Sequence, residues 1–178
     1  MSTTRTAAPA NAVQGAIVFT DIAGFTEFTA VRGDEAALEL LAIQERLIRL
    51  EMGEHGHIVK ELGDGLMLWF EDACQAVSCS LAFQEEFERR SSAEDMPLWV
   101  RIGIHYGRSL KRGNDVIGHD VNVAARIVDL AAPGEVLVSE ATAARVTEDG
   151  TDIGFEEIGP AMMKGIPEPV QIYRAVRA

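Results

Sequence analysis

Two aspartates at the ends of separate apolar segments could bind metal ions together. Asp21 follows the apolar run of residues 16–20, and Asp64 lies in a Gly-Asp-Gly turn just before the apolar run of residues 66–70. Carboxylate oxygens are preferred ligands of Mg²⁺, and two divalent ions can bind a triphosphate while activating a hydroxyl group. The sequence therefore predicts a site for a pair of divalent metals on a nucleotide triphosphate.

Five further polar residues could complete such a site: Lys60, Asp115, Asn122, Arg126 and Lys164. Lys60 precedes the turn aspartate by four residues. Asn122 and Arg126 are four residues apart, so on a helix their side chains would lie on one face. Asp115 and Lys164 are expected in loops.

Each candidate also has an ordinary structural interpretation. Asp21 could cap the helix that follows it, and Asp64 could be a turn residue beside glycines. The other five could simply be solvated surface groups. The histidines show no ligand spacing such as H-E-x-x-H and support no metal site.

The composition is that of one acidic globular domain. The chain has 178 residues, of which 47% are hydrophobic, and its formal net charge is −12. This length and apolar content are sufficient for a hydrophobic core. The negative charge argues against nucleic acid as a partner, because phosphate contacts need clustered Lys and Arg. A polyanionic substrate would therefore have to be bound through metal ions.

The sequence also predicts where the protein resides. No apolar run reaches the roughly 18 residues of a membrane span, and residues 1–14 lack the apolar centre of a signal peptide. Cys74 and Cys79 match neither a zinc spacing nor a disulfide framework, so we expect reduced thiols. We expect a cytoplasmic protein with a flexible tail at residues 1–14 and one domain at residues 15–178.

The apolar periodicity predicts alternating strands and helices. Strands are expected at residues 16–20, 57–61, 66–70, 98–106, 135–138, 153–158 and 170–176. Helices are expected at residues 73–90, 119–131 and near 140–146, and also after Gly24, where Leu40, Ile43, Leu47 and Leu50 recur at helical spacing. The order β-α-β-β-α-β with C-terminal additions is typical of an α+β, ferredoxin-like antiparallel sheet with helices on one face.

Four motifs occur together and resemble the catalytic domain of class III nucleotidyl cyclases from Gly15 onward. They are F-T-D-I-A-G-F-T, K-E-L-G-D-G-L-M, N-D-V-I-G-H-D-V-N-V-A-A-R and M-K-G-I-P-E-P-V-Q-I-Y. The resemblance implies an adenylate cyclase, which converts ATP to 3′,5′-cyclic AMP and pyrophosphate. It also implies that Asp21, Asp64 and the backbone carbonyl of Ile22 hold two Mg²⁺ or Mn²⁺ ions.

The resemblance assigns roles to the remaining candidates. The loop before the first helix would bind phosphates through backbone groups, as a helix N-terminus can; its residues include Gly24, Phe25 and Thr26. In the other motifs Lys60 and Asp115 would read adenine, Asn122 would position the ribose, Arg126 would stabilise the reacting phosphate, and Lys164 would bind the terminal phosphates.

Hydrogen-bonding groups favour adenine over guanine. Lysine only donates and ionised aspartate only accepts, which suits the N1 acceptor and the 6-amino donor of adenine. Guanine would set its N1 donor against Lys60, and the guanylyl pattern of the family has glutamate at that position. ATP is therefore the expected substrate, and guanylate cyclase activity is the nearest alternative.

The family works as a head-to-tail dimer whose active sites combine metal aspartates from one subunit with base-reading and phosphate-stabilising residues from the other. This chain has both sets, which implies a homodimer with two shared sites. A non-catalytic regulatory domain would be expected to lack a metal aspartate or the arginine. An RNA-binding sheet would need basic charge, and a diguanylate cyclase a G-G-D-E-F-like turn.

Overall fold

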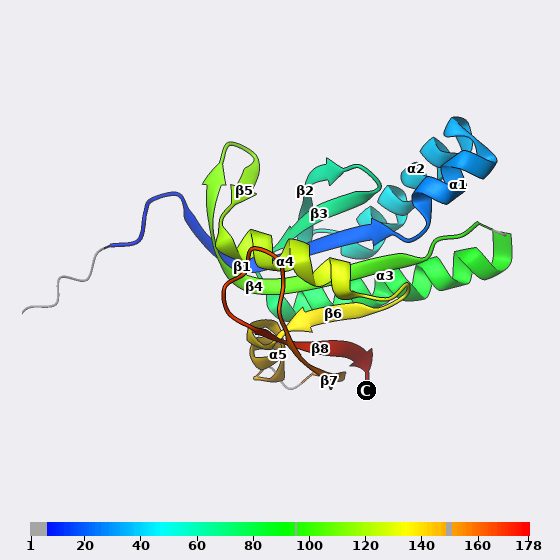
Figure 1. Ribbon diagram of the computed structural model, residues 1–178. Helices are drawn as coiled ribbons and strands as arrows, with labels where there is room; N and C mark the ends of the chain where they lie inside the picture. The colour runs from blue at the N-terminus through cyan, green and yellow to red at the C-terminus, as the bar shows by residue number, and fades with distance from the viewer. Residues whose placement is uncertain (1–6, 95, 149–150) are drawn as a thin grey trace, which may run out of the picture.

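A mostly antiparallel sheet of eight strands forms the centre of the protein (Figure 1). The computed structural model describes residues 7–94, 96–148 and 151–178. The strand order is β2-β3-β1-β4-β6-β8-β7, and β5 pairs with β4 off this path. Among the described strand pairs, β4 and β6 are parallel and the others are antiparallel.

The strands are β1 (Ala12–Ile22), β2 (Gly56–Leu62), β3 (Gly65–Phe70), β4 (Val100–Arg112), β5 (Asp115–Ile117), β6 (Val136–Ser139), β7 (Ile153–Ala161) and β8 (Val170–Arg177). The helices are α1 (Phe25–Arg32), α2 (Asp34–Met52), α3 (Ala73–Glu94), α4 (His119–Leu130) and α5 (Glu140–Thr147). The predicted α+β class and ferredoxin-like element order are confirmed.

Alternation along the strands gives the sheet two different faces. Ala16 and Val18 of β1 belong to the main core with residues of α2, α3 and α5. Ile17 and Phe19 point the other way and pack with residues of α4. Figure 1 shows α4 lying across the sheet in front of β1 and β4. We call this side the α4 face.

The position of α4 differs from the expectation that the helices lie on one face. Two glycines of β4 allow the helix to approach the opposite face. A Cβ on Gly103 would lie 2.4 Å from the backbone nitrogen of Val128, and one on Gly107 would lie 2.2 Å from Oδ2 of Asp120. Both distances are shorter than any real contact, so α4 can pack here only against bare backbone.

The predicted first helix is divided at Gly33, whose φ of 90° lies in a region that favours glycine. The buried side of α2 includes Leu40, Ile43 and Leu47, as expected. Leu50 is 71% exposed, so it does not extend that apolar stripe. Ile48 and Met52 occupy the buried positions in that turn and the next.

Residues 12–14, which were predicted to belong to a flexible tail at residues 1–14, are part of a strand. Strand β1 begins at Ala12, and this residue pairs with Leu110 of β4. Residues 1–6 lie outside the described part of the chain. Among the described helices none is long and apolar enough to cross a membrane.

Candidate active site

The two predicted metal ligands lie next to each other. Asp21 is near the end of β1, and Asp64 is in the turn between β2 and β3, which joins β1 through β3. Burial and a side-chain hydrogen bond with Asp21 raise the pKa of Asp64 to about 6, and the charge of Asp21 acts in the same direction. Two carboxyl groups this close need a shared proton or a cation between them.

Asp21 is not a helix cap, and Asp64 is a turn residue that also lies beside a second carboxylate. Asp21 does not cap the following helix, since Gly24 is the N-cap of α1 and no side chain caps it. Asp64 does occupy a turn, next to Gly63 with its φ of 60°. A turn residue alone, however, does not require a second carboxylate beside it.

Arg101 is a charged neighbour of this pair that the sequence did not reveal. It is the register partner of Asp21 across β1 and β4, and its Nη2 donates to Oδ2 of Asp21. The side chains are 32% and 24% exposed, so the ion pair remains open to solvent. The Nε of Arg101 is buried and has no hydrogen-bond partner among the described residues. Arg101 therefore contributes one ion pair to the carboxylates and has one buried donor that is not satisfied among the described residues.

A buried polar group supports the Asp64 turn from the main core. Gln44 of α2 is almost fully buried, and its Nε2 donates to the backbone carbonyl of Asp64 at 3.3 Å. Thr20 accepts a bond from the backbone N–H of Leu66 at 3.0 Å and donates to Gln44 at 3.4 Å. The turn is therefore fixed to β1 and α2, and the Asp64 side chain is held near Asp21.

Asp21 and Asp64 fit a divalent cation. Their like charges and the raised pKa of Asp64 show that positive charge between them would be favourable. Among the described residues no cluster of three or more His, Cys, Asp or Glu side chains could hold a metal ion. A cation here would need further oxygen ligands, and Mg²⁺ is often bound by one or two carboxylates plus substrate phosphates.

The loop after Asp21 leads directly into a helix N-terminus. Gly24 has a φ of 70°, and its carbonyl accepts the first bond of α1 from Phe28. The backbone N–H groups of Phe25 and Thr26 come before this first bond, so they have no acceptor within α1. These two residues are predicted to bind phosphate. The carbonyl of Ile22 stays a predicted metal ligand.

Lys60 and Asp115 are brought together although 55 residues separate them. Lys60 Nζ donates to Oδ2 of Asp115 at 3.0 Å, and both side chains are more than one third exposed. This bond is the main cause that lowers the pKa of Asp115. A shift in strand register between Ile58 and Lys60 sets Lys60 opposite Met67, on the α4 face. Asp115 begins β5, where a loop was expected.

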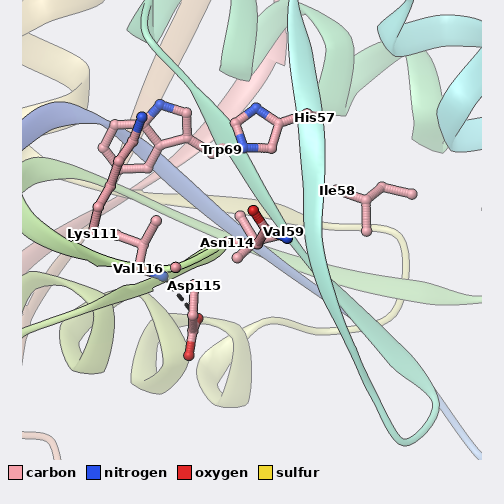
Figure 2. A pocket seen from close by; sticks show the side chains of 9 residues that line it. His57, Ile58, Val59, Trp69, Lys111, Asn114, Asp115 and Val116 are labelled. Atoms are coloured by element: carbon pink, nitrogen blue, oxygen red, sulfur yellow. Dashed lines mark hydrogen bonds between the residues drawn. The ribbon is translucent and has the colours of Figure 1, made fainter.

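A cavity of about 330 Å³ lies beside this ion pair, between β2 and the β4–β5 hairpin. Figure 2 shows His57 and Lys111 near Trp69, with Asp115 pointing away from that group. Asn114 also lines the cavity. The sequence did not identify these polar residues as parts of a site, and only Asn114 had a local signal, its place in the turn between β4 and β5.

Asn122 and Arg126 lie one turn apart on the exposed side of α4. Arg126 Nη1 is 3.7 Å from Oδ2 of Asp129 on the same helix. Among the described hydrogen bonds and ion pairs, none joins either residue to Asp21 or Asp64. In the described part of one chain, these two sets of residues therefore form separate polar groups.

Lys164 is exposed in the turn between β7 and β8. Its neighbours Met163 and Ile166 are buried in a cluster with Val123 and Ile127 of α4. The turn that carries Lys164 therefore packs against α4, the helix on which Asn122 and Arg126 are exposed. Three groups result: the carboxylates with Arg101, the Lys60–Asp115 pair, and the polar residues of α4 with Lys164.

Comparison with known proteins identifies related sequences over nearly the whole chain. The family described as adenylate and guanylate cyclase catalytic domain matches residues 8–175. Putative adenylate cyclase 3 of Rhizobium meliloti is 32% identical over 161 residues, which cover 89% of this chain and 27% of that protein. An adenylate cyclase of Streptomyces coelicolor is 34% identical over 129 residues, covering 72% and 33%. The chain thus spans about a quarter to a third of the length of these relatives.

Solved structures show the same arrangement of elements. The adenylyl cyclase CyaB from P. aeruginosa matches with a TM-score of 0.78 at 29% identity, covering 94% of this chain and 95% of that one. The adenylate/guanylate cyclase/hydrolase from Silicibacter pomeroyi matches with a TM-score of 0.78 at 28% identity, covering 94% and 98%.

Proposed function

Since the chain belongs to the family of adenylate and guanylate cyclase catalytic domains, we propose that it converts ATP to 3′,5′-cyclic AMP and pyrophosphate. The observation that carries the proposal is the adjacent pair Asp21 and Asp64 on the same side of the sheet as α4. In the reaction the ribose 3′ oxygen loses its proton and bonds to the α-phosphorus. The bond from that phosphorus to the pyrophosphate oxygen breaks.

This chemistry needs no protein nucleophile. Two Mg²⁺ or Mn²⁺ ions held by Asp21, Asp64 and the Ile22 carbonyl would lower the pKa of the 3′ hydroxyl and neutralise triphosphate charge. The free N–H groups at the start of α1 suit the same phosphates. Arg101 is ion-paired with Asp21, and its partly exposed guanidinium would be a cation beside the carboxylates for binding phosphate oxygens.

The residues of α4 would act on the ribose and the reacting phosphate. Asn122 would position the ribose, and Arg126 would stabilise negative charge as the 3′ oxygen attacks. An arginine in such a role can contribute about 10³ to 10⁵ in rate. Lys164 would bind the terminal phosphates from its exposed turn.

The Lys60–Asp115 pair supports ATP as the substrate. The pair presents one donor and one acceptor, 3.0 Å apart, at an exposed position. Adenine matches both groups through N1 and its 6-amino group, whereas guanine would set its N1 donor against the lysine. A mismatched polar group can discriminate by up to about 10⁴, and less in a solvated site.

We further propose that the active site is shared between two copies of the chain. Among the described residues of one chain, no hydrogen bond or ion pair joins the metal carboxylates to Asn122 or Arg126, yet the proposed reaction needs both sets. A two-fold homodimer would supply two equivalent sites. The proposed compartment is the cytoplasm, where the thiols of Cys74 and Cys79 stay reduced.

The proposal is tested by incubating the purified protein with Mn²⁺ and either ATP or GTP and measuring cyclic nucleotide by mass spectrometry. We expect cyclic AMP in excess of cyclic GMP. Asp64→Asn should abolish the product, and Glu45→Gln, which changes an acidic residue on α2 outside the site, should not. Cyclic GMP as the main product would identify a guanylate cyclase, and no product from either nucleotide would overturn the enzymatic proposal.

A further inference from the structure

One histidine lies beneath α4, between the two glycines on which the helix packs. His105 is on β4, with Gly103 and Gly107 on either side of it along the same face. Its side chain is 12% exposed. Its Nε2 is 3.2 Å from Oδ1 of Asp120 in the first turn of α4, and its Nδ1 is 2.7 Å from Oγ of Ser139. The imidazole thus connects the start of α4 with the start of α5.

The direction of these hydrogen bonds follows from the chemistry of the groups. An ionised Asp120 can only accept, so the Nε2 of His105 must carry the proton. In a neutral imidazole Nδ1 is then an acceptor, and the hydroxyl of Ser139 donates to it. Burial lowers the pKa of His105, although Asp120 opposes the shift, and this agrees with a neutral ring near pH 7.

The network continues beyond both ends of the imidazole. Ser139 Oγ is 3.1 Å from Oγ1 of Thr142. Since the Ser139 hydroxyl donates to His105, the Thr142 hydroxyl is the donor in this bond and Ser139 Oγ is the acceptor. Thr142 Oγ1 accepts from the backbone N–H of Tyr106 at 2.9 Å. At the other end Oδ2 of Asp120 accepts from the backbone N–H of Arg108 at 2.7 Å. Each hydroxyl and ring nitrogen in the chain therefore has a partner in one consistent direction.

The network fixes one helix relative to one strand. Asp120 is attached to β4 both through the imidazole and through the backbone of Arg108, and Gly107 leaves room for its carboxylate. Asn122 and Arg126 follow on the same helix, two and six residues later, on its exposed side. Any rotation of α4 about its axis would move both exposed side chains and would break the bonds of Asp120.

We propose that His105 is a positioning residue, which holds α4 through Asp120 so that Asn122 and Arg126 face the substrate correctly. This inference rests on the proposed cyclase function but assigns a role to residues outside the predicted site. His105 does not touch the reacting atoms, and its effect passes through the orientation of the helix. Since small misplacements of reacting groups are costly, loss of the network should lower kcat much more than it changes KM for ATP.

Two conservative variants test this inference from opposite sides of the imidazole. Asp120→Asn leaves only one acceptor oxygen for the two N–H groups, of His105 and Arg108, that now donate to the carboxylate. This substitution leaves α5 unchanged. Ser139→Ala removes the donor to Nδ1, and it also removes the side-chain cap of α5, which accepts from the backbone N–H of Thr142. The matched controls are Glu140→Gln, an acidic residue in the first turn of α5, and Ser80→Ala, a buried hydroxyl in α3 that bonds within its own helix.

We expect Asp120→Asn and Ser139→Ala to lower kcat about 10- to 100-fold, with KM for ATP changed less than about threefold. The controls should stay within about twofold of the unmodified protein. In a background that lacks both positioned side chains, Asn122→Ala with Arg126→Ala, the same substitutions should have almost no further effect on the residual kcat, because the residues they position are absent. A merely structural role would lower kcat by the same factor in both backgrounds and would overturn the inference.

Amide hydrogen exchange provides a readout that does not depend on activity. We expect the amides of α4 to exchange faster in Asp120→Asn and Ser139→Ala than in the two controls. Equal exchange in variants and controls would overturn the inference even if the protein is an active cyclase. If the unmodified protein makes no cyclic nucleotide, the proposed function fails, while the exchange measurement still decides whether the network holds α4.

Discussion

Asp21 and Arg101 are register partners on adjacent strands and form an ion pair on the α4 face of the sheet. The guanidinium of Arg101 is thus already bound to Asp21, one of the two carboxylates expected to bind metal ions. A divalent cation at Asp21 must compete with this resident positive charge, and the displaced guanidinium would be free to bind phosphate. We therefore expect this ion pair to link metal binding to triphosphate binding.

We predict that Arg101→Gln increases the affinity for Mn²⁺ in the absence of nucleotide and weakens binding of ATP. Removing a partly exposed charge of this kind should change the metal affinity about five- to tenfold. Isothermal titration calorimetry measures both affinities. Arg49→Gln, which breaks a surface pair with Glu45 on α2, is the control and should change neither. Unchanged Mn²⁺ affinity in Arg101→Gln would show that the arginine does not compete for Asp21.

A second prediction concerns the pH dependence of the metal-free protein. The pKa of Asp64 is raised to about 6, so between about pH 4 and pH 6 the folded state binds more protons than the unfolded state. The contribution of Asp64 to stability therefore falls as pH rises through this window. Above it, two adjacent negative charges remain.

Asp64→Asn removes this repulsion and should stabilise the metal-free protein above pH 6. After allowance for solvent screening we expect on the order of 1 kcal/mol, or about 2 to 4 °C in Tm. The difference from the unmodified protein should shrink at pH 5, where Asp64 is already protonated. Thermal unfolding in the presence of a chelator measures this, and a Tm difference independent of pH would contradict it.

Base specificity should depend on the Lys60–Asp115 pair. Lys60→Glu combined with Asp115→Asn supplies an acceptor for the guanine N1 donor and a donor for its O6. We expect the ratio of kcat/KM for ATP to that for GTP to fall by about 10² or more. Lys111→Gln, which changes a lysine lining the adjacent cavity, is the control and should leave the ratio nearly unchanged. A ratio unaffected by the double substitution would show that this pair does not read the base.

The sequence suggested candidate site residues but not the residues that surround them. Asp21 and Asp64 could be singled out because Asp21 follows an apolar run and Asp64 lies in a turn just before another, and the joint motifs indicated Lys60 and Asp115 as partners. Arg101 was missed because its importance depends on the register of β1 with β4, which pairs it with Asp21. Local periodicity contains no information about register between strands 80 residues apart.

The same limit applies to the fold. Apolar periodicity predicted α4, but not the face of the sheet on which it lies. That choice depends on Gly103 and Gly107, whose bare backbone becomes meaningful only when the helix packs against it. The short strand β5 spans three residues, too few for an alternating pattern, so Asp115 was expected in a loop.

The central claim, a cyclase site shared by two copies of the chain, is tested most directly by mixing Asp21→Ala and Arg126→Ala proteins. Each variant alone should make almost no cyclic AMP, because every site would lack one essential residue. In an equal mixture half of the dimers are mixed and one of their two sites is intact, so we predict about a quarter of the unmodified activity. Absence of any recovery, with dimer exchange verified, would contradict the account.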